Sequence, residues 1–96
     1  MPKYTYQDLD SVVNVKSWLQ WKRLYQREKR YIKANKNNKY WILEKKTHEA
    51  KLQQAKYQAD FYKYYLDKMY PGWKKRYKMT NKYLDSLIKD IRKVIS

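Results

Sequence analysis

Few side chains in this sequence could do acid–base, nucleophilic or metal chemistry. His48 is the only histidine and there is no cysteine, so a thiolate nucleophile, a sulfur-ligated metal and a disulfide framework are excluded. We expect His48 to have no acidic or second histidine partner that would make it a base or a ligand, and we assign it a structural role. Glu44 and Glu49 are five residues apart, which is poor spacing for paired-carboxylate chemistry on one helix face.

Motifs that signal catalysis are also absent from the sequence. There is no glycine-rich phosphate loop, no GxSxG and no HExxH. We therefore expect a non-catalytic protein with no cofactor and no metal site.

Positive charge is the strongest chemical signal in the chain. The sequence carries 24 Lys and Arg against 9 Asp and Glu, a net charge of +15. Residues 20–46 hold ten cations against two acids, and residues 73–83 hold five cations and no acid. Charge of one sign concentrated in this way repels itself, and a polyanion relieves the repulsion while releasing its counterions. The sequence thus predicts a polyanionic partner, either a nucleic acid or an acidic protein surface.

Lysine outnumbers arginine, 19 to 5. Lysine is a flexible point charge suited to phosphate, whereas readout of guanine favours the arginine fork, so we expect backbone contact with little sequence preference. Pro71 and Gly72 turn the chain before Trp73, and we expect backbone N–H groups at a helix start there to add to the lysine charge. The candidate polyanion-binding residues are Lys22, Arg23, Arg27, Lys29, Arg30, Lys33, Lys36, Lys39, Trp73, Lys74, Lys75, Arg76, Lys78 and Lys82.

Other interpretations of the same residues stay open. The cations could form a solvated surface that only confers solubility, and rings at helical spacing are more often core than platforms for stacked bases. A second function is a protein-binding inhibitor or regulator of the kind that phages and other mobile elements encode against a host protein, including one that handles nucleic acid. A third is a cationic protein active at membrane surfaces, which the content of Lys, Trp and Tyr resembles but the regular apolar seams oppose.

The elements that must position these residues are helices. One glycine and two prolines in 96 residues leave too few turn signals for an all-β fold, and this length suits one domain. We predict a single all-α domain over residues 1–96, a three-helix bundle with helices at 11–34, 39–70 and 72–95. A break near Thr80 would make it a four-helix bundle, and a cap formed by Thr5 and Asp8 would start the first helix earlier.

The long central helix has two apolar seams. The first seam consists of Leu52, Ala55, Ala59, Tyr62, Leu66 and Met69, spaced three and four apart. The second lies almost opposite and consists of Leu43, Ala50, Tyr57 and Tyr64, with Phe61 beside them. We therefore expect this helix to lie between neighbours, or to leave a patch for a homodimer or another partner. Pairs four apart (Lys45 and Glu49, Lys56 and Asp60, Lys63 and Asp67) predict a solvated ladder between the seams.

The last helix is predicted from Tyr77, Thr80, Leu84, Leu87, Ile91 and Val94, again spaced three and four apart. No apolar stretch has the length of a signal peptide or a membrane span, so we expect a cytoplasmic protein.

Overall fold

The computed structural model describes residues 3–95, and every regular element in that range is a helix. The helices are α1 (Tyr6–Asn35), α2 (Trp41–Met69), α3 (Trp73–Arg76) and α4 (Asn81–Ile95). This confirms the predicted all-α class and its four-helix form. The predicted domain of residues 1–96 also includes Met1, Pro2 and Ser96, which lie outside the described residues.

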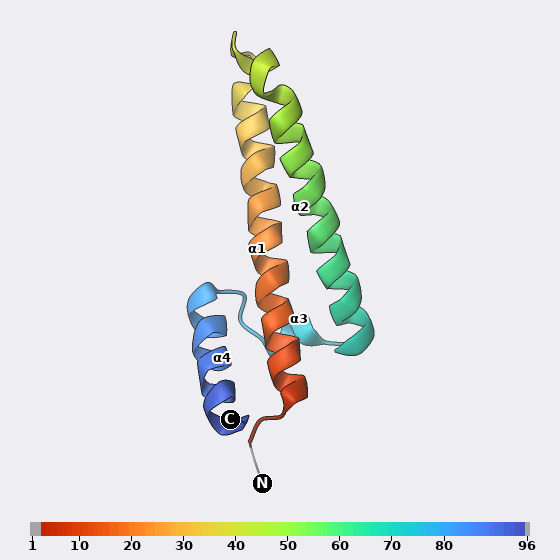
Figure 1. Cartoon of the computed structure of the whole chain (residues 1–96), viewed down its shortest axis with the longest axis vertical. Coiled ribbons are helices and arrows are strands. Elements are labelled where there is room, and N and C mark those ends of the chain that lie inside the picture. Colours follow the sequence, from red (N-terminus) through yellow and green to blue (C-terminus); the bar gives the residue numbers. More distant parts are fainter. Residues whose placement is uncertain (1–2, 96) are drawn as a thin grey trace.

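Two long helices set the shape of the molecule. α1 and α2 run antiparallel along its whole length, and α4 packs on the lower half of α1, on the side away from α2 (Figure 1). The short α3 lies near the lower end of α1, where the chain returns from α2 (Figure 1). The described chain measures 62 by 25 by 22 Å, so it is a rod thickened at one end.

The start of α1 is fixed by a capping box. The Asp8 N–H donates to the Thr5 hydroxyl (3.3 Å), and the Thr5 N–H donates to the Asp8 carboxylate (2.9 Å). These bonds satisfy two donors that a helix start leaves free. The helix therefore begins at Tyr6 rather than at residue 11, which confirms the alternative start that the Thr5 and Asp8 pair predicted.

The predicted continuous helix over residues 72–95 is wrong, because the chain breaks between α3 and α4. Gly72 has φ +84, a left-handed conformation that favours glycine, and it ends the turn after α2. Tyr77 is extended, and its hydroxyl is 3.0 Å from the Ser11 hydroxyl inside the core. The Thr80 hydroxyl then accepts from the Tyr83 N–H (3.2 Å) at the start of α4, so Thr80 is an exposed cap and not a seam residue.

The main core lies at the thick end, where all four helices meet. Trp73 of α3 is 1% exposed and packs edge-on against Trp18 of α1, with ring centroids 4.8 Å apart. The buried residues of this core are Val12, Val15, Trp18, Leu19, Leu66, Trp73, Tyr77, Leu84, Ile88 and Ile91.

A polar cluster joins α1 to the end of α2 at the thick end. One carboxylate oxygen of Asp10 accepts from the hydroxyls of both Tyr65 and Tyr70, each at 2.6 Å. The hydrogen bond from Tyr65, followed by that from Tyr70, lowers the pKa of Asp10. The pKa of Tyr65 is raised mainly by its bond to Asp10, and that of Tyr70 is raised by burial and then by Asp10.

The first predicted seam of α2 faces α1. Ala55 and Leu66 are completely buried there, while Met69 at its end is exposed. The second predicted seam is exposed from Leu43 to Tyr64, so the expectation that it packs against a neighbour is not met within the described chain.

Candidate functional site

A groove of about 410 Å³ lies where α1, α2 and α3 meet. Five lysines and a single acid line it, together with two aromatic rings from α1. We call it the lysine groove. Its lining residues are Trp18, Lys22, Tyr25, Gln26, Lys29, Lys56, Ala59, Asp60, Lys63 and Lys74.

Helical spacing brings the α1 and α2 residues of the groove into line. On α1, Trp18, Lys22, Tyr25 and Lys29 are spaced four, three and four apart and therefore share one face. On α2, Lys56 and Lys63 are two turns apart on the edge that borders the α1 contact. A small residue, Ala59, stands between them and leaves space beside α1.

The lysine from α3 is positioned by its neighbour. The buried Trp73 anchors the single turn of α3, and its indole N–H donates to the Asp67 carboxylate at 2.8 Å. That anchor holds Lys74 over the groove, where its Nζ is 5.7 Å from the centroid of the Trp18 ring. Lys22 Nζ is 4.7 Å from the same ring. The two basic segments, far apart in the sequence, thus meet over one aromatic ring.

The groove is electropositive because most of its lysines lack a carboxylate partner. Among the described residues, Lys63 is the one groove lysine with an ion pair, to Asp67 at 2.9 Å. The hydrogen bond from Lys63, then that from Trp73, lowers the pKa of Asp67. Ammonium groups held over aromatic faces gain a cation–π attraction but remain charged and hydrated on their outer side. The arrangement can therefore hold an anion with several negative groups.

A second groove of about 630 Å³ continues the first toward the far end of the hairpin, and Lys29 lines both. We call it the distal groove. It is lined by Lys29, Ile32, Lys33, Lys36, Trp41, Lys45 and Glu49. From Lys22 to Lys36 the axis of α1 rises roughly 21 Å at 1.5 Å per residue. One strand of B-DNA carries a phosphate about every 3.4 Å along its axis, so the two grooves match a run of about six phosphates.

The predicted site residues divide into two sets. Lys22, Lys29 and Lys74 line the lysine groove, and Lys33 and Lys36 line the distal groove. The residues that line neither groove are Arg23, Arg27, Arg30, Lys39, Trp73, Lys75, Arg76, Lys78 and Lys82.

Several residues of the second set have contacts of their own. Arg23 donates to the Met79 carbonyl at 3.5 Å, and Arg76 pairs with Asp8 at 3.1 Å. Lys39 lies over the ring of Tyr40 in the loop between α1 and α2, with its Nζ 5.4 Å from the centroid. These cations add to the overall field without lining the groove.

Trp73 does not line a binding surface, contrary to the sequence prediction. Its ring is a central part of the core and cannot contact a ligand there. The helix that it starts has only four residues, and two of its N–H groups already have acceptors: those of Trp73 and Lys75 donate to the carbonyls of Tyr70 (3.2 Å) and Gly72 (3.1 Å). No phosphate site at this helix start is retained.

The sequence interpretation missed the lysines that α2 contributes. Lys56, Lys63 and Lys45 were assigned to a solvated ladder of ion pairs, yet of the three expected pairs only Lys63 with Asp67 occurs among the described residues. Each of these lysines borders the seam that faces α1. Their proximity to that seam was the signal that could have placed them in the groove.

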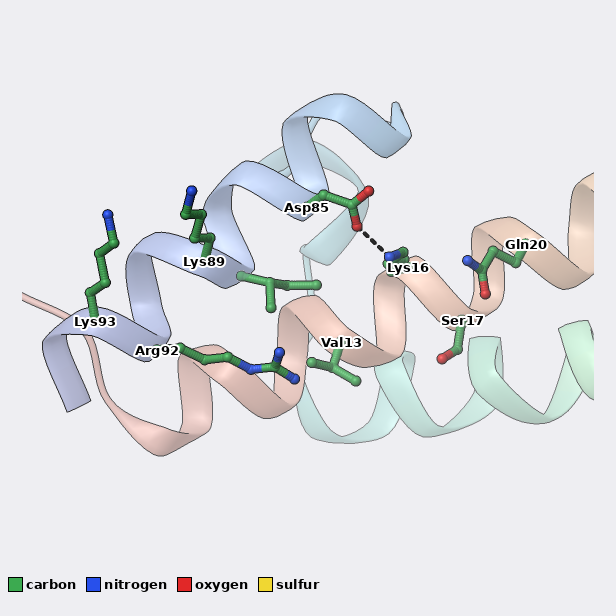
Figure 2. Close-up of a pocket in the computed structure, with 9 residues that line it drawn as sticks. Val13, Lys16, Ser17, Gln20, Asp85, Lys89, Arg92 and Lys93 are labelled. Atoms are coloured by element: carbon green, nitrogen blue, oxygen red, sulfur yellow. Dashed lines mark ion pairs between the residues drawn. The ribbon is translucent and has the colours of Figure 1, made fainter. Parts of the chain in front are cut away.

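Another groove, of about 660 Å³, separates α1 from α4. Lys16 and Asp85 form an ion pair across it, and Arg92 points toward Val13 on its floor (Figure 2). Lys89 and Lys93 extend from α4 away from α1 (Figure 2). Lys16 is paired with the one acid of this groove, and two of its three α4 cations point away from α1, so the groove is a less concentrated positive site than the lysine groove.

His48 has the acidic partner that we expected it to lack. Its Nδ1 is 2.7 Å from a carboxylate oxygen of Glu28, a residue that is 8% exposed. The imidazole also stacks on Tyr31, whose hydroxyl donates to Glu44 at 2.9 Å and whose pKa is raised chiefly by that bond. The pair comes from two helices that only the folded hairpin brings together, and it ties α1 to α2 at the thin end.

Within residues 3–95, no group of three or more His, Cys, Asp or Glu side chains is placed to hold a metal ion. In the same range no helix combines the length and the apolar character needed to cross a bilayer. No protein-family model, curated protein or solved structure matches the chain.

Proposed function

We propose that this chain is a non-catalytic binding protein that holds a nucleic-acid backbone in the lysine groove and its distal continuation. The observation that carries the proposal is the convergence of Lys22 and Lys29 from one basic segment with Lys74 from the other, in a groove to which α2 adds two more lysines. Five cations against one acid form a binding surface for phosphate, and the absence of arginine from the groove favours contact without base readout.

The ring of Trp18 supports backbone binding rather than base stacking. Trp18 is only 6% exposed, and two ammonium groups lie over its ring. A base cannot stack on a ring that is buried and already covered. Affinity should therefore come mainly from released counterions and should depend steeply on salt.

The experiment compares two triple variants that remove the same charge. K22Q/K29Q/K74Q removes the charge of three of the five groove lysines, whereas K75Q/K78Q/K82Q removes the charge of three exposed lysines outside the groove. Binding of fluorescent single-stranded DNA, duplex DNA and RNA is followed by polarisation at several salt concentrations. Circular dichroism confirms that both variants keep their helix content.

The groove variant should lose far more affinity than the control. If each groove lysine neutralises one phosphate, the slope of log K against log salt for a single strand falls in magnitude by about 2, at roughly 0.7 per contact. Equal losses in the two variants would show that net charge and not the groove drives binding. An unmodified protein that binds none of the three probes, or binds them independently of salt, would remove the proposal.

A further inference from the structure

The outer face of α2 is an exposed row of apolar side chains, made of Leu43, Ala50, Tyr57, Phe61 and Tyr64. Leu43 is 78% exposed, and the three rings are 70%, 54% and 67% exposed. α1 packs on the opposite side of α2, and no other element covers this face (Figure 1). A contiguous apolar stripe of this kind on a soluble protein marks a contact surface.

We propose that two copies of this chain pair through this face, with their α2 helices antiparallel. The spacing of the face is that of a coiled-coil seam. Leu43, Ala50, Tyr57 and Tyr64 recur at sevens, and a second row lies four residues after each of them. The second row consists of Thr47, Gln54, Phe61 and Lys68.

Antiparallel pairing matches a large ring with a small side chain in two of its four layers, Phe61 with Ala50 and Tyr64 with Thr47. In this arrangement each residue of one row lies opposite a residue of the other row in the second copy, and each such pair forms a layer. One register aligns all four layers. Phe61 then packs on Ala50 of the second copy, and Tyr57 packs beside Gln54 of the second copy. At the ends of the seam, the stem of Lys68 covers Leu43 of the second copy. Large-on-small layers of this kind let two helices approach closely.

Charges at the edge of the seam select the antiparallel orientation. In the same register, Lys46 lies opposite Asp67 of the second copy, and symmetry repeats this pair at the other end. A parallel dimer would instead place Lys46 beside Lys51 of the second copy, again twice, and like charges at this position repel. α2 as a whole carries six lysines against four acids, so this helix is less positive than the chain, whose net charge is +15.

The area is adequate for a reversible dimer. Rings of 150–250 Å² exposed to this extent contribute about 400 Å² per copy. Leu43 and Ala50 add to this area, and weak, transient interfaces bury less than about 600 Å² per partner.

Antiparallel pairing has a consequence for the lysine groove. Asp60, Lys56 and Lys63 lie on the same edge of α2 as Lys46 and Asp67, by helical spacing. The two-fold axis of an antiparallel pair is perpendicular to the plane of the two helices. It therefore places this edge of both copies on the same side of the dimer. Both lysine grooves would therefore open on the same side, whereas a parallel dimer would turn them to opposite sides. The dimer itself does not depend on the proposed nucleic-acid function.

Sedimentation or light scattering across a range of protein concentration tests the pairing without any ligand. The unmodified protein should dimerise, and F61E should raise the dissociation constant at least about thirtyfold, as loss of a central aromatic contact does. Y6E is the matched control, because Tyr6 is 73% exposed but lies at the start of α1, outside the face. A protein that stays monomeric at every concentration overturns the proposal, as does a dimer that F61E and Y6E weaken equally.

Cysteine cross-linking tests the orientation, which is simple in a chain with no native cysteine. L43C and K68C should each fail to cross-link alone, while the L43C/K68C double variant forms covalent dimers under mild oxidation. An internal disulfide in the double variant is impossible, because 25 residues of helix separate the sulfurs by roughly 37 Å. Efficient cross-linking of L43C alone would show a parallel dimer and contradict the proposed arrangement.

Discussion

Replacing Asp10 with Asn should weaken the thick end of the rod in a way that depends on pH. The carboxylate accepts two short hydrogen bonds, from Tyr65 and Tyr70, and its other oxygen accepts from Asn14 at 3.1 Å. The amide of an asparagine has one acceptor oxygen. If that oxygen keeps the two tyrosine hydroxyls, the NH₂ group faces the NH₂ group of Asn14, and the negative charge that strengthens all three bonds is lost. D10N therefore removes a charge-assisted bond without changing the size of the side chain.

The expected loss follows from the number and the kind of bonds. A hydrogen bond to a charged group contributes about 1.5–3 kcal/mol when buried. The Asp10 cluster is only part-buried, so solvent screening reduces the expected loss for D10N to about 1–2 kcal/mol. For a domain of this size, each kcal/mol lowers Tm by roughly 4–8 °C, which a thermal scan detects easily.

The sign of the pH dependence follows from the direction of the pKa shifts. The pKa of Asp10 is lower in the folded chain than in the unfolded chain, so its contribution is complete above the unfolded value near 4. The contribution then declines as pH falls through the folded value. The pKa values of Tyr65 and Tyr70 are raised on folding, so their contribution is present below about pH 10 and is lost as pH rises through the folded values.

The assay is urea unfolding of the unmodified protein and D10N at a series of pH values, at constant salt, followed by tryptophan fluorescence. The difference in unfolding free energy should be constant between about pH 5 and 9, and it should shrink below pH 4. A difference of less than a few tenths of a kcal/mol at pH 7, or one that stays unchanged in strong acid, would refute the role assigned to Asp10.

Three further substitutions test the fold. W73A should lower the free energy of unfolding by about 3–5 kcal/mol in urea, because it leaves a cavity in the core. W73F keeps a ring at this position and should lower it by much less. G72A should lower stability by about 1 kcal/mol in a thermal scan, through backbone strain at φ +84 alone, since nothing lies within 4 Å of the added carbon. H48L should cost about 1–3 kcal/mol in urea unfolding by leaving the carboxylate of Glu28 without its partner, and E28L/H48L should recover part of that loss.

Much of the fold could be predicted because local signals and packing agree. The Thr5 and Asp8 cap, the seam through Ala55 and Leu66, and the turn at Pro71 each depend on short-range chemistry that the sequence shows directly. The break after α3 could not be located with the same certainty. Tyr77 and Thr80 continue the three-and-four spacing of α4, and the feature that draws Tyr77 into an extended conformation is its contact with Ser11, a residue distant in the sequence.

The candidate site could be predicted only in part, since its lining depends on how α1 and α2 are rotated against each other. Counting charges along the chain singled out Lys22, Lys29 and Lys74, but it also included Arg23 and Arg27, one residue away from groove positions or on the next face of the helix. A shift of one residue turns a side chain by about 100° around a helix, so neighbours in a basic segment separate onto different surfaces.

The sequence also could not show which seam of α2 packs against the rest of the chain and which stays exposed, for a related reason. The two seams could be read from the sequence, but which of them the chain itself would cover depends on the fold. The structure shows α1 on the seam of Ala55 and Leu66 and leaves Tyr57 and Phe61 exposed. The choice between an internal neighbour and a second molecule was therefore made by the tertiary arrangement.

Lysine footprinting tests the central claim most directly. The protein is acetylated briefly with and without a single-stranded oligonucleotide, and the extent of reaction at each lysine is measured by mass spectrometry. The account predicts that the oligonucleotide protects the lysines of the two grooves, while Lys75, Lys78 and Lys82 stay reactive. The groove lysines are Lys22, Lys29, Lys33, Lys36, Lys45, Lys56, Lys63 and Lys74. Equal protection of all exposed lysines, or protection confined to those outside the two grooves, would contradict it.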